Sequence, residues 1–220
     1  STPKILESYT KQDKRIRTYR QDNKGLTRAL NDGLELCNAS LIARQDADDR
    51  SLPERLAKQV AFMDENPETV LLGTSANLIG ESRIAYSETI MPTRDEEIRR
   101  GMQKTNQFFH TSVVFRRETI QNLQGYDTDF RRAQDYELWF RMLDEGHGAN
   151  LAEPLVDLNL AGGRISRTQS RKQVSAALRA KWKNRKGSVL KNAPLHLFWW
   201  QLRGFLIPFG TIAALRAKRS

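Results

Sequence analysis

The chain has 220 residues, of which 39% are apolar, and a formal net charge of +10 at pH 7. This length and apolar content suffice for one domain with a buried core plus an appendage, and they exclude a disordered charged tail. The single cysteine, Cys37, excludes an internal disulfide, and no cysteine and histidine cluster has zinc-ligand spacing. These features favour a reducing, cytoplasmic setting.

The sequence shows neither the pattern of an export signal nor that of a simple membrane span. Residues 1–15 are polar and charged, without an apolar stretch of signal-peptide length. No uninterrupted apolar run reaches the roughly 18 residues that a transmembrane helix needs. We therefore expect any membrane contact to be peripheral.

Helical and extended patterns alternate along most of the chain. The apolar residues of the first expected helix fall on one face, namely Leu26, Ala29, Leu30, Leu34 and Cys37. The expected helices are 23–37, 51–63, 94–104 and 135–146, and the expected strands are 40–43, 69–80, 111–115 and 149–160. Such alternation favours an α/β fold, with a sheet flanked by helices.

Three carboxylates, Asp46, Asp48 and Asp49, follow the first expected strand. Like charges this close repel each other, so the cluster requires a positive partner. One interpretation makes them turn residues and dipole partners of the next helix, where Ser51 and Glu54 have capping-box spacing. The other is an Asp-x-Asp pair at the end of a strand, which can hold Mg²⁺ or Mn²⁺ together with water and substrate phosphates.

Four further residues are candidates for a site or for the core. Asp135 begins a helix, where the dipole favours an acid by about 0.3–1 kcal/mol. His110 precedes a strand, and a single histidine is more often a structural hydrogen-bonding residue than a ligand. Arg44 lies at the end of a buried strand and would be costly unless the nearby acids or a phosphate pair with it. We expect Trp139 in the core.

Several of these stretches together resemble the family 2 glycosyltransferases, which are inverting enzymes of the GT-A fold that use nucleotide-diphosphate sugars. The resemblance covers most of residues 1–166, and the order and spacing of its motifs are specific. It implies a mixed sheet flanked by helices, while the helical basic tail that follows lies outside the resemblance. The motifs that carry it are residues 23–67, 108–118, 125–130 and 133–142.

The resemblance also implies roles for individual residues. Asp46 and Asp48 are similar to the family's Asp-x-Asp pair, which meets the nucleotide ribose and a diphosphate-bound Mg²⁺ or Mn²⁺. Arg44 and His110 fall at the donor side of the site. Asp135 matches the catalytic base, which removes the proton of the acceptor hydroxyl during a single displacement. For Asp49, a capping role and a supporting role both stay open.

One departure from the family concerns the start of the chain. Residues 1–9 resemble the end of the family's Asp-Asp-Gly-Ser-Thr stretch, so the first strand and nucleotide-binding loop, about thirty residues in the family, are not present. We therefore expect residues 1–160 to form an N-terminally truncated GT-A domain with an exposed strand edge. A truncated, inactive remnant is one alternative function.

The C-terminal segment is strongly basic. Residues 158–220 contain 14 Lys or Arg and no Asp or Glu, so they carry +14 and the first 157 residues carry −4. This asymmetry predicts a separate role for residues 161–220 with an anionic partner. Within this tail, 167–191 is a basic helical stretch and 194–220 is an apolar segment that ends in cations, a pattern typical of an anionic membrane interface.

Two alternatives for the tail stay open. It could be a helical subdomain packed on the body, or it could bind nucleic acid, since its cations could track phosphates. The long apolar run and the lack of a nucleic-acid motif disfavour the second alternative. We expect a metal-dependent glycosyltransferase in cell-surface polysaccharide or glycolipid synthesis, peripheral at the inner face of the membrane, with a saccharide or lipid-linked acceptor. The alternative is an inactive remnant or a basic adapter that binds membrane or nucleic acid.

Overall fold

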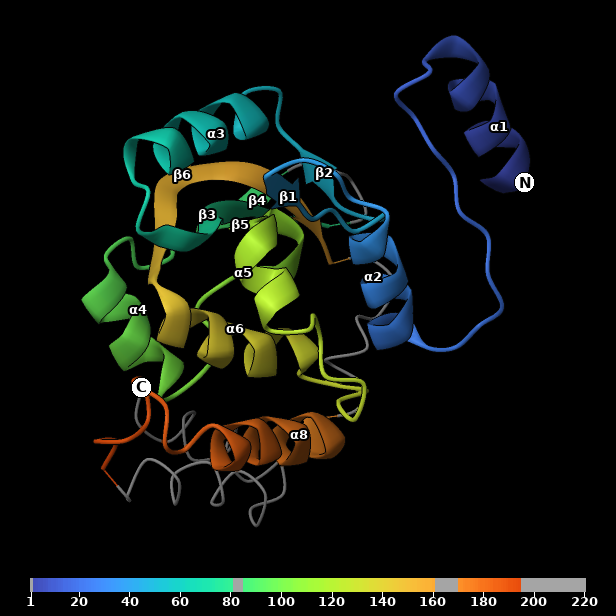
Figure 1. Ribbon diagram of the computed structural model, residues 1–220. Coiled ribbons are helices and arrows are strands. Elements are labelled where there is room, and N and C mark those ends of the chain that lie inside the picture. Colours follow the sequence, from blue (N-terminus) through green and yellow to red (C-terminus); the bar gives the residue numbers. More distant parts are fainter. Residues whose placement is uncertain (1, 81–84, 161–169, 195–220) are drawn as a thin grey trace.

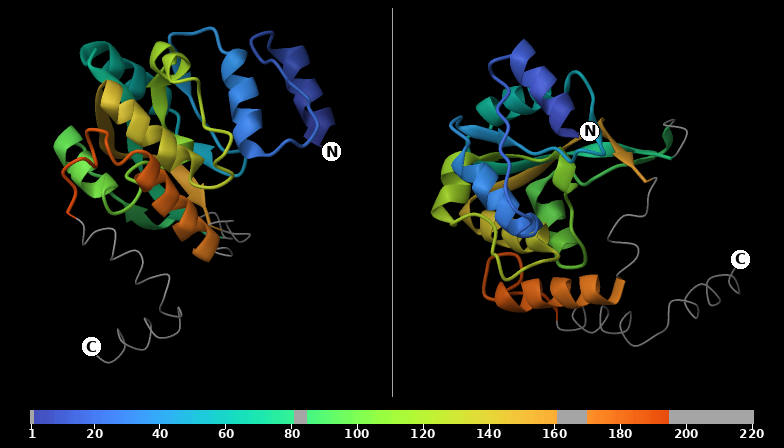
Figure 2. Two further views of the ribbon diagram at one scale, coloured as in Figure 1. Left: turned by 60° about the horizontal axis from the view of Figure 1, so that its bottom comes forward. Right: turned by 90° about the vertical axis from the view of Figure 1, so that its right-hand side faces the viewer.

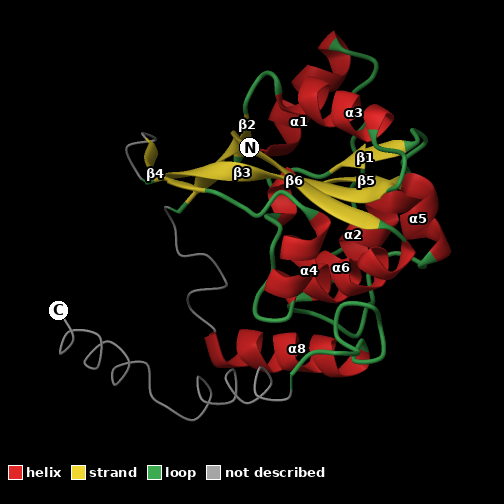
Figure 3. Ribbon diagram, turned by 90° about the vertical axis from the view of Figure 1, so that its left-hand side faces the viewer, coloured by secondary structure: helices red, strands yellow, loops and turns green. Residues whose placement is uncertain are grey.

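The computed structural model describes residues 2–80, 85–160 and 170–194. Within these ranges, a mixed sheet carries helices on both faces (Figures 1 and 3). The strands are β1 (Leu41–Ala43), β2 (Arg50–Ser51), β3 (Thr69–Ile79), β4 (Ala85–Thr89), β5 (Val114–Arg116) and β6 (His147–Asn159). The helices are α1 (Thr2–Gln12), α2 (Leu26–Glu35), α3 (Arg55–Glu65), α4 (Asp95–Met102), α5 (Arg117–Asn122), α6 (Gln134–Glu145) and α8 (Ser170–Lys183), and a 3-10 turn, η1, spans His110–Ser112.

The strand order of the sheet is β1-β5-β3-β6-β2, and β4 pairs with β3 outside this path. β3 and β6 run parallel, whereas β1 with β5, β3 with β5, β2 with β6 and β3 with β4 are antiparallel. The mixed sheet flanked by helices is therefore confirmed. β1 lies at one edge of this order, so the acidic loop that follows it begins at the rim of the sheet.

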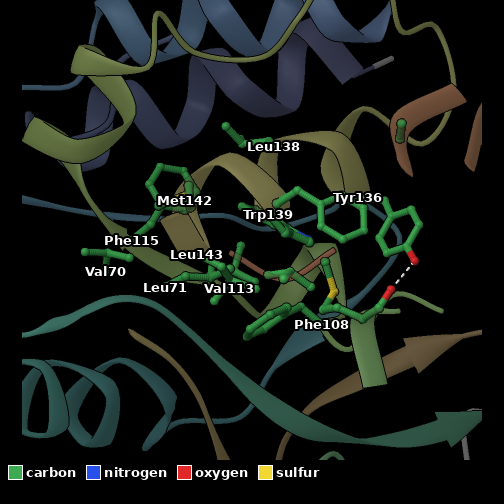
Figure 4. Packing of buried hydrophobic residues seen from close by; sticks show 14 of the residues in the cluster. Val70, Leu71, Phe108, Val113, Phe115, Tyr136, Leu138, Trp139, Met142 and Leu143 are labelled. Atoms are coloured by element: carbon green, nitrogen blue, oxygen red, sulfur yellow. Dashed lines mark hydrogen bonds between the residues drawn. The ribbon is translucent and has the colours of Figure 1, made fainter. Parts of the chain in front are cut away.

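β3 connects the two layers of the core. It is buried without interruption from Thr69 to Ala76, although Thr74 and Ser75 are polar, and its side chains alternate between the two faces of the sheet. Leu71 packs in the cluster that contains Trp139 of α6, as expected for this tryptophan (Figure 4). Leu72 packs on the opposite face with Met63 of α3. The sheet is thus held between α3 on one side and α6 on the other.

One sequence prediction about the start of a helix is wrong. α3 begins at Arg55 with Glu54 at the N-cap, and no side chain caps it. Ser51 instead lies in β2, paired with Val156, and its hydroxyl donates a hydrogen bond to Gln45 Oε1 at 2.5 Å. The capping-box spacing failed because strand pairing holds Ser51 four residues before the first helical residue.

Part of the basic segment packs on the body. α8 lies along α6, on the side away from the sheet (Figure 3). Ala180, Val189 and Leu190 are buried in the same cluster as Trp139. The expected helix within 167–191 is confirmed, and its described part packs against the body, as one of the alternatives proposed. The apolar segment 194–220 lies outside the described residues from position 195 onward.

Two other features of the described chain bear on its surroundings. α1 buries none of its residues and stands beside the body (Figures 1 and 2). Among the helices in the described ranges, none is both long and apolar enough to cross a membrane.

Candidate active site

The acidic loop after β1 is tied to the turn η1. The backbone N–H of Asp46 donates to Thr111 Oγ1 at 2.9 Å, and Gln45 Nε2 donates to the same oxygen at 3.3 Å. Thr111 is 2% exposed, so its hydroxyl is shielded from water. A residue of η1 thereby fixes the backbone at the first carboxylate of the Asp-x-Asp pair.

Arg44 supplies the positive charge that the acidic cluster requires. Its Nη1 lies 2.5 Å from Asp46 Oδ2, and its side chain is only 10% exposed, against 40% for Asp46. The expectation that Arg44 pairs with a neighbouring acid is confirmed. Arg44 Nε is buried, and the residues that the structure describes offer it no hydrogen-bond partner. A spare buried donor therefore lies beside the acidic loop.

The other two carboxylates of the cluster have different surroundings. Asp49 Oδ1 accepts a hydrogen bond from the backbone of Asn159 at 2.9 Å, which ties the loop to the end of β6. Next to it, Arg50 Nε donates to the buried Asp157 at 2.8 Å. Asp48, by contrast, is exposed. Asp49 thus supports the loop, and Asp48 is presented to the outside.

Arg55 is the buried centre of this region. It is 1% exposed and donates to Gln45 Oε1 at 2.9 Å, to Ser51 Oγ at 2.8 Å and to the carbonyl of Arg44 at 2.8 Å. Burial, with the positive charge of Arg44 added, lowers the pKa of Arg55 to about 10, so it stays charged at pH 7. The sequence analysis missed this residue, and no local pattern in the sequence marks this arginine as buried.

Asp135 lies in the first turn of α6, far from the acidic loop in the sequence. Ala133 precedes the helix with a left-handed backbone, φ 52° and ψ 26°, which turns the chain into α6. Asn106 Nδ2 donates to Asp135 Oδ2 at 2.8 Å and so orients the carboxylate. No hydrogen bond from another described residue reaches Oδ1.

His110 lies between the two acidic regions. Its Nε2 is 2.8 Å from the hydroxyl of Tyr126, and its ring meets Trp139 edge to face at 5.9 Å. Burial lowers its pKa to about 4. The negative charges of Asp135 and Asp46 oppose this shift, and the positive charge of Arg44 adds to it. His110 is therefore neutral at pH 7. Thr111, the next residue, holds the backbone of Asp46, and Trp139 lies one helical turn after Asp135, so η1 links the predicted residues of the two acidic regions.

Tyr126, which holds His110, is itself held by α2. Asn31 forms a two-way contact with its backbone, donating to the carbonyl at 2.8 Å and accepting from the N–H at 2.8 Å. Gly125 permits this contact, because it has φ 71° and a Cβ there would lie 2.6 Å from Asn31 Oδ1. Sequence analysis missed Asn31, Asn106, Thr111 and Tyr126, and no local pattern marks them.

The two carboxylates of the Asp-x-Asp pair suit a metal site that a substrate completes. The described ranges contain no cluster of three or more His, Cys, Asp or Glu side chains arranged as metal ligands. Mg²⁺ and Mn²⁺ need few carboxylates, because they keep water and take phosphate oxygens as ligands. Asp46 and Asp48 fit such a shared site, and the spare N–H of Arg44 suits a phosphate oxygen.

A positively charged cavity of about 640 Å³ opens beside the start of α2. Lys24 and Arg28 line it from the α2 side and Arg131 from the loop before α6, and its lining includes no carboxylate. The loop is docked there because Thr27 Oγ1 donates to the carbonyl of Phe130 at 2.7 Å. The chemistry of this cavity favours an anionic group.

Residues 1–123 match the protein family described as Glycosyl transferase family 2. This chain belongs to that family. It is 35% identical over 161 residues to an uncharacterized glycosyltransferase of Haemophilus influenzae, covering 71% of this chain and 58% of the relative. It is 33% identical over 151 residues to the amylovoran biosynthesis glycosyltransferase AmsE of Erwinia amylovora, covering 67% and 55%. The chain thus spans little more than half the length of these relatives.

Solved structures show the same fold. The TM-score is 0.64 to Staphylococcus aureus TarS 1-349 in complex with UDP-GlcNAc, at 14% identity, covering 93% of this chain and 59% of that one. It is 0.60 to the mannosyltransferase PcManGT of Pyrobaculum calidifontis in complex with GDP-Man and Mn²⁺, at 17% identity, covering 98% and 62%. The mixed sheet and its helices are therefore the GT-A fold of this family.

Proposed function

We propose that this chain carries the catalytic core of a metal-dependent, inverting glycosyltransferase, which moves a sugar from a nucleotide-diphosphate sugar to an acceptor hydroxyl. The observation that carries the proposal is that η1 joins the two acidic regions, since Thr111 holds the backbone of Asp46 and His110 packs on Trp139, one helical turn after Asp135. These residues come from the end of β1, the turn η1 and the start of α6. The catalytic core would lie in residues 1–160, and residues 161–220, of which α8 packs on that core, would have a separate role.

The donor side of the site is the acidic loop. Asp46 and Asp48 would hold Mg²⁺ or Mn²⁺ together with the diphosphate, and Arg44 would add its spare N–H to a phosphate oxygen. A bound divalent ion acts as a Lewis acid that stabilises the charge of the leaving diphosphate. Support comes from the solved relatives in complex with UDP-GlcNAc and with GDP-Man and Mn²⁺.

The acceptor side of the site is the start of α6. In the proposed step the acceptor oxygen forms a bond to the anomeric carbon, while the bond from that carbon to the phosphate oxygen breaks and its electron pair stays on the diphosphate. The acceptor proton passes to Asp135, whose Oδ1 is free of hydrogen bonds from the described residues while Asn106 holds Oδ2. One displacement inverts the configuration at the carbon. His110, neutral at pH 7, is a hydrogen-bonding residue of the pocket.

The acceptor belongs to cell-surface polysaccharide or glycolipid synthesis. Relatives act in amylovoran biosynthesis and, in Escherichia coli, in O-antigen biosynthesis, where the match is 36% identical over 142 residues. A saccharide or lipid-linked acceptor fits this role, and the cationic cavity beside α2 would accept a phosphate of such an acceptor. For synthesis of this kind we propose a location at the cytoplasmic face of the membrane, in peripheral contact with anionic lipid. Nucleic acid is not the expected partner.

A thermal-shift experiment tests the donor site on the chain as it is. Mn²⁺ and a nucleotide diphosphate together should raise the midpoint of unfolding more than the sum of their separate effects, because each completes the site of the other. Asp48→Asn should abolish the joint shift. Asp64→Asn, which changes an exposed acid at the far end of α3, is the control and should keep it. A joint shift that survives in Asp48→Asn would contradict the assignment.

A further inference from the structure

α8 has an inner face that is fully engaged with the body. Lys181 is 1% exposed and donates to the carbonyl of Gln103, just after α4, at 2.6 Å. Lys183 lies 2.6 Å from Asp127 and 2.8 Å from the buried Glu137 of α6. The cations of this face are therefore bound to backbone carbonyls and carboxylates of the body, and they hold α8 in a fixed position.

The outer face of α8 carries a tryptophan among cations. Trp182 is 65% exposed, and the guanidinium carbon of Arg185 lies 4.5 Å from the centre of its ring. At 100° per residue, Arg171 and Trp182 fall on the side of the helix opposite the fully buried Ala180. Lys172 and Lys186 are also exposed. We define the outer face as Arg171, Lys172 and Trp182 of α8 together with Arg185 and Lys186 of the turn that follows it.

The charges of the outer face are not used within the body. The acids near α8 pair with other cations: Asp127 and Glu137 with Lys183, and Asp129 with Arg179 at 3.6 Å. Over the described ranges, no ion pair links a cation of the outer face to a carboxylate. A large indole that stays exposed beside uncompensated positive charge is not explained by the folding of the domain.

We propose that the outer face of α8 docks on an anionic lipid bilayer, with Trp182 at the boundary between headgroups and acyl chains. Each cation near an anionic leaflet contributes about 1 kcal/mol, and an indole with one polar edge favours this boundary. A bilayer offers both negative charge and an apolar layer beneath it, which matches both features of the face. The sequence continues this chemistry, since Phe198, Trp199 and Trp200 follow in a segment without acids.

The proposal rests on the peripheral membrane contact proposed above, and it gives that contact an orientation. Lys183 joins α8 to Glu137 of α6, the helix that begins beside Asp135. Docking of the outer face would therefore set the acceptor side of the site at a fixed distance from the bilayer. A lipid-linked acceptor would then reach Asp135 without leaving the membrane.

Tryptophan fluorescence tests the proposal in the full chain. The four tryptophans are 139, 182, 199 and 200, so Trp199→Phe with Trp200→Phe leaves the fully buried Trp139 and the exposed Trp182. Vesicles of phosphatidylglycerol and phosphatidylcholine with brominated acyl chains should quench the emission of Trp182 and leave that of Trp139. Adding Trp182→Phe should remove the quenched component.

Charge reversal provides the second measurement, with a matched control. Arg185→Glu with Lys186→Glu, or Trp182→Ala, should weaken cosedimentation with the same vesicles roughly tenfold or more. Two control variants change exposed residues of the same types elsewhere: Tyr19→Ala matches Trp182→Ala, and Lys14→Glu with Arg20→Glu matches the charge reversal. Both controls should bind vesicles like the unmodified chain.

Several outcomes would overturn the proposal. One is unquenched Trp182 together with outer-face variants that bind vesicles like the control. Another is a deletion of 195–220 that abolishes binding while the outer-face variants bind normally, which would assign the contact to the tail alone. Tight, salt-sensitive binding to a single-stranded RNA in place of vesicles would assign the face to nucleic acid. The thermal-shift experiment with Mn²⁺ and nucleotide is done without lipid. Its result therefore tests the donor-site assignment independently of the membrane proposal.

Discussion

The acidic loop after β1 and the start of α6 hold their carboxylates in different ways. Asp46 sits in a loop whose backbone is tied by Thr111 and whose side chain is paired with Arg44. Asp135 is fixed by one amide, that of Asn106, at the rigid first turn of a buried helix. The loop thus depends on many neutral and charged partners, whereas Asp135 depends mainly on the helix.

This difference matches the chemistry proposed for each acid. A loop that binds a metal and a diphosphate must present several oxygens together, so its backbone has to be held from more than one side. A general base needs a single oxygen in one orientation, and the first turn of a helix supplies that. We therefore expect substitutions around the loop to change stability and donor binding, and substitutions at Asp135 to change turnover.

The largest expected effect is at Arg55, the buried support of the loop. Arg55→Met keeps an unbranched apolar side chain but removes the hydrogen bonds to Gln45, Ser51 and the carbonyl of Arg44, and it leaves the buried Oε1 of Gln59 without its donor. Because hydrogen bonds to charged groups contribute about 1.5–3 kcal/mol each, we expect a loss of about 3 kcal/mol or more in the free energy of unfolding. Urea unfolding measures it. A loss below 1 kcal/mol would mean that the loop is held mainly by Thr111.

Asp135→Asn should come next. If Asp135 takes the acceptor proton, turnover in a version of the protein with measurable transfer should fall by roughly 10² or more, equivalent to about 2.7 kcal/mol, with nearly unchanged donor binding. Glu96→Gln is the control, because Glu96 is an acid in the first turn of α4. Near-normal turnover with stability lowered by about 1 kcal/mol would show instead that Asp135 serves only the helix dipole.

The pH dependence of stability tests the position of His110 between the two regions. Its folded pKa of about 4 lies below its unfolded value of 6.5, so the unfolded chain binds the proton first as the pH falls. The contribution of the neutral imidazole to the free energy of unfolding is therefore present above pH 6.5 and is lost as the pH falls toward 4. At pH 5 the loss is about 2 kcal/mol. His110→Gln should flatten this part of the difference curve. Parallel curves for both proteins between pH 7 and 4.5 would place His110 in a solvated environment.

The smallest effect is expected at Thr111. Thr111→Val keeps the shape but removes the oxygen that accepts from Asp46 and Gln45, so stability should fall by about 1 kcal/mol. The joint thermal shift with Mn²⁺ and nucleotide diphosphate should also shrink, because the backbone at Asp46 is released. Thr111→Ser retains the oxygen and should restore both. If Val and Ser behave alike in both measurements, the hydroxyl does not position the loop.

The sequence by itself predicted the longer helices and strands of the body, but not α1, α5, β2 or β4, and it predicted several candidate residues of the site. The apolar patterns of α2, α6 and the start of β3 are local properties, since a period near 3.6 or a short apolar run such as Val70–Leu72 selects the element without distant contacts. The pairing of Arg44 with an acid was also predictable, because Arg44 and Asp46 are two positions apart and a buried cation needs a partner.

Only the tertiary structure decided what holds these residues in place. Thr111 reaches Asp46 across 65 positions, and Asn31 reaches Tyr126 across 95. Such contacts depend on which strands pair and in which register, and one polar side chain resembles many others in the sequence. Ser51 shows that a local pattern can also mislead when a distant contact decides the structure. Its spacing from Glu54 favoured a helix cap, but its hydroxyl bonds to Gln45 and Arg55 because β2 pairs with β6 and folding brings these groups together.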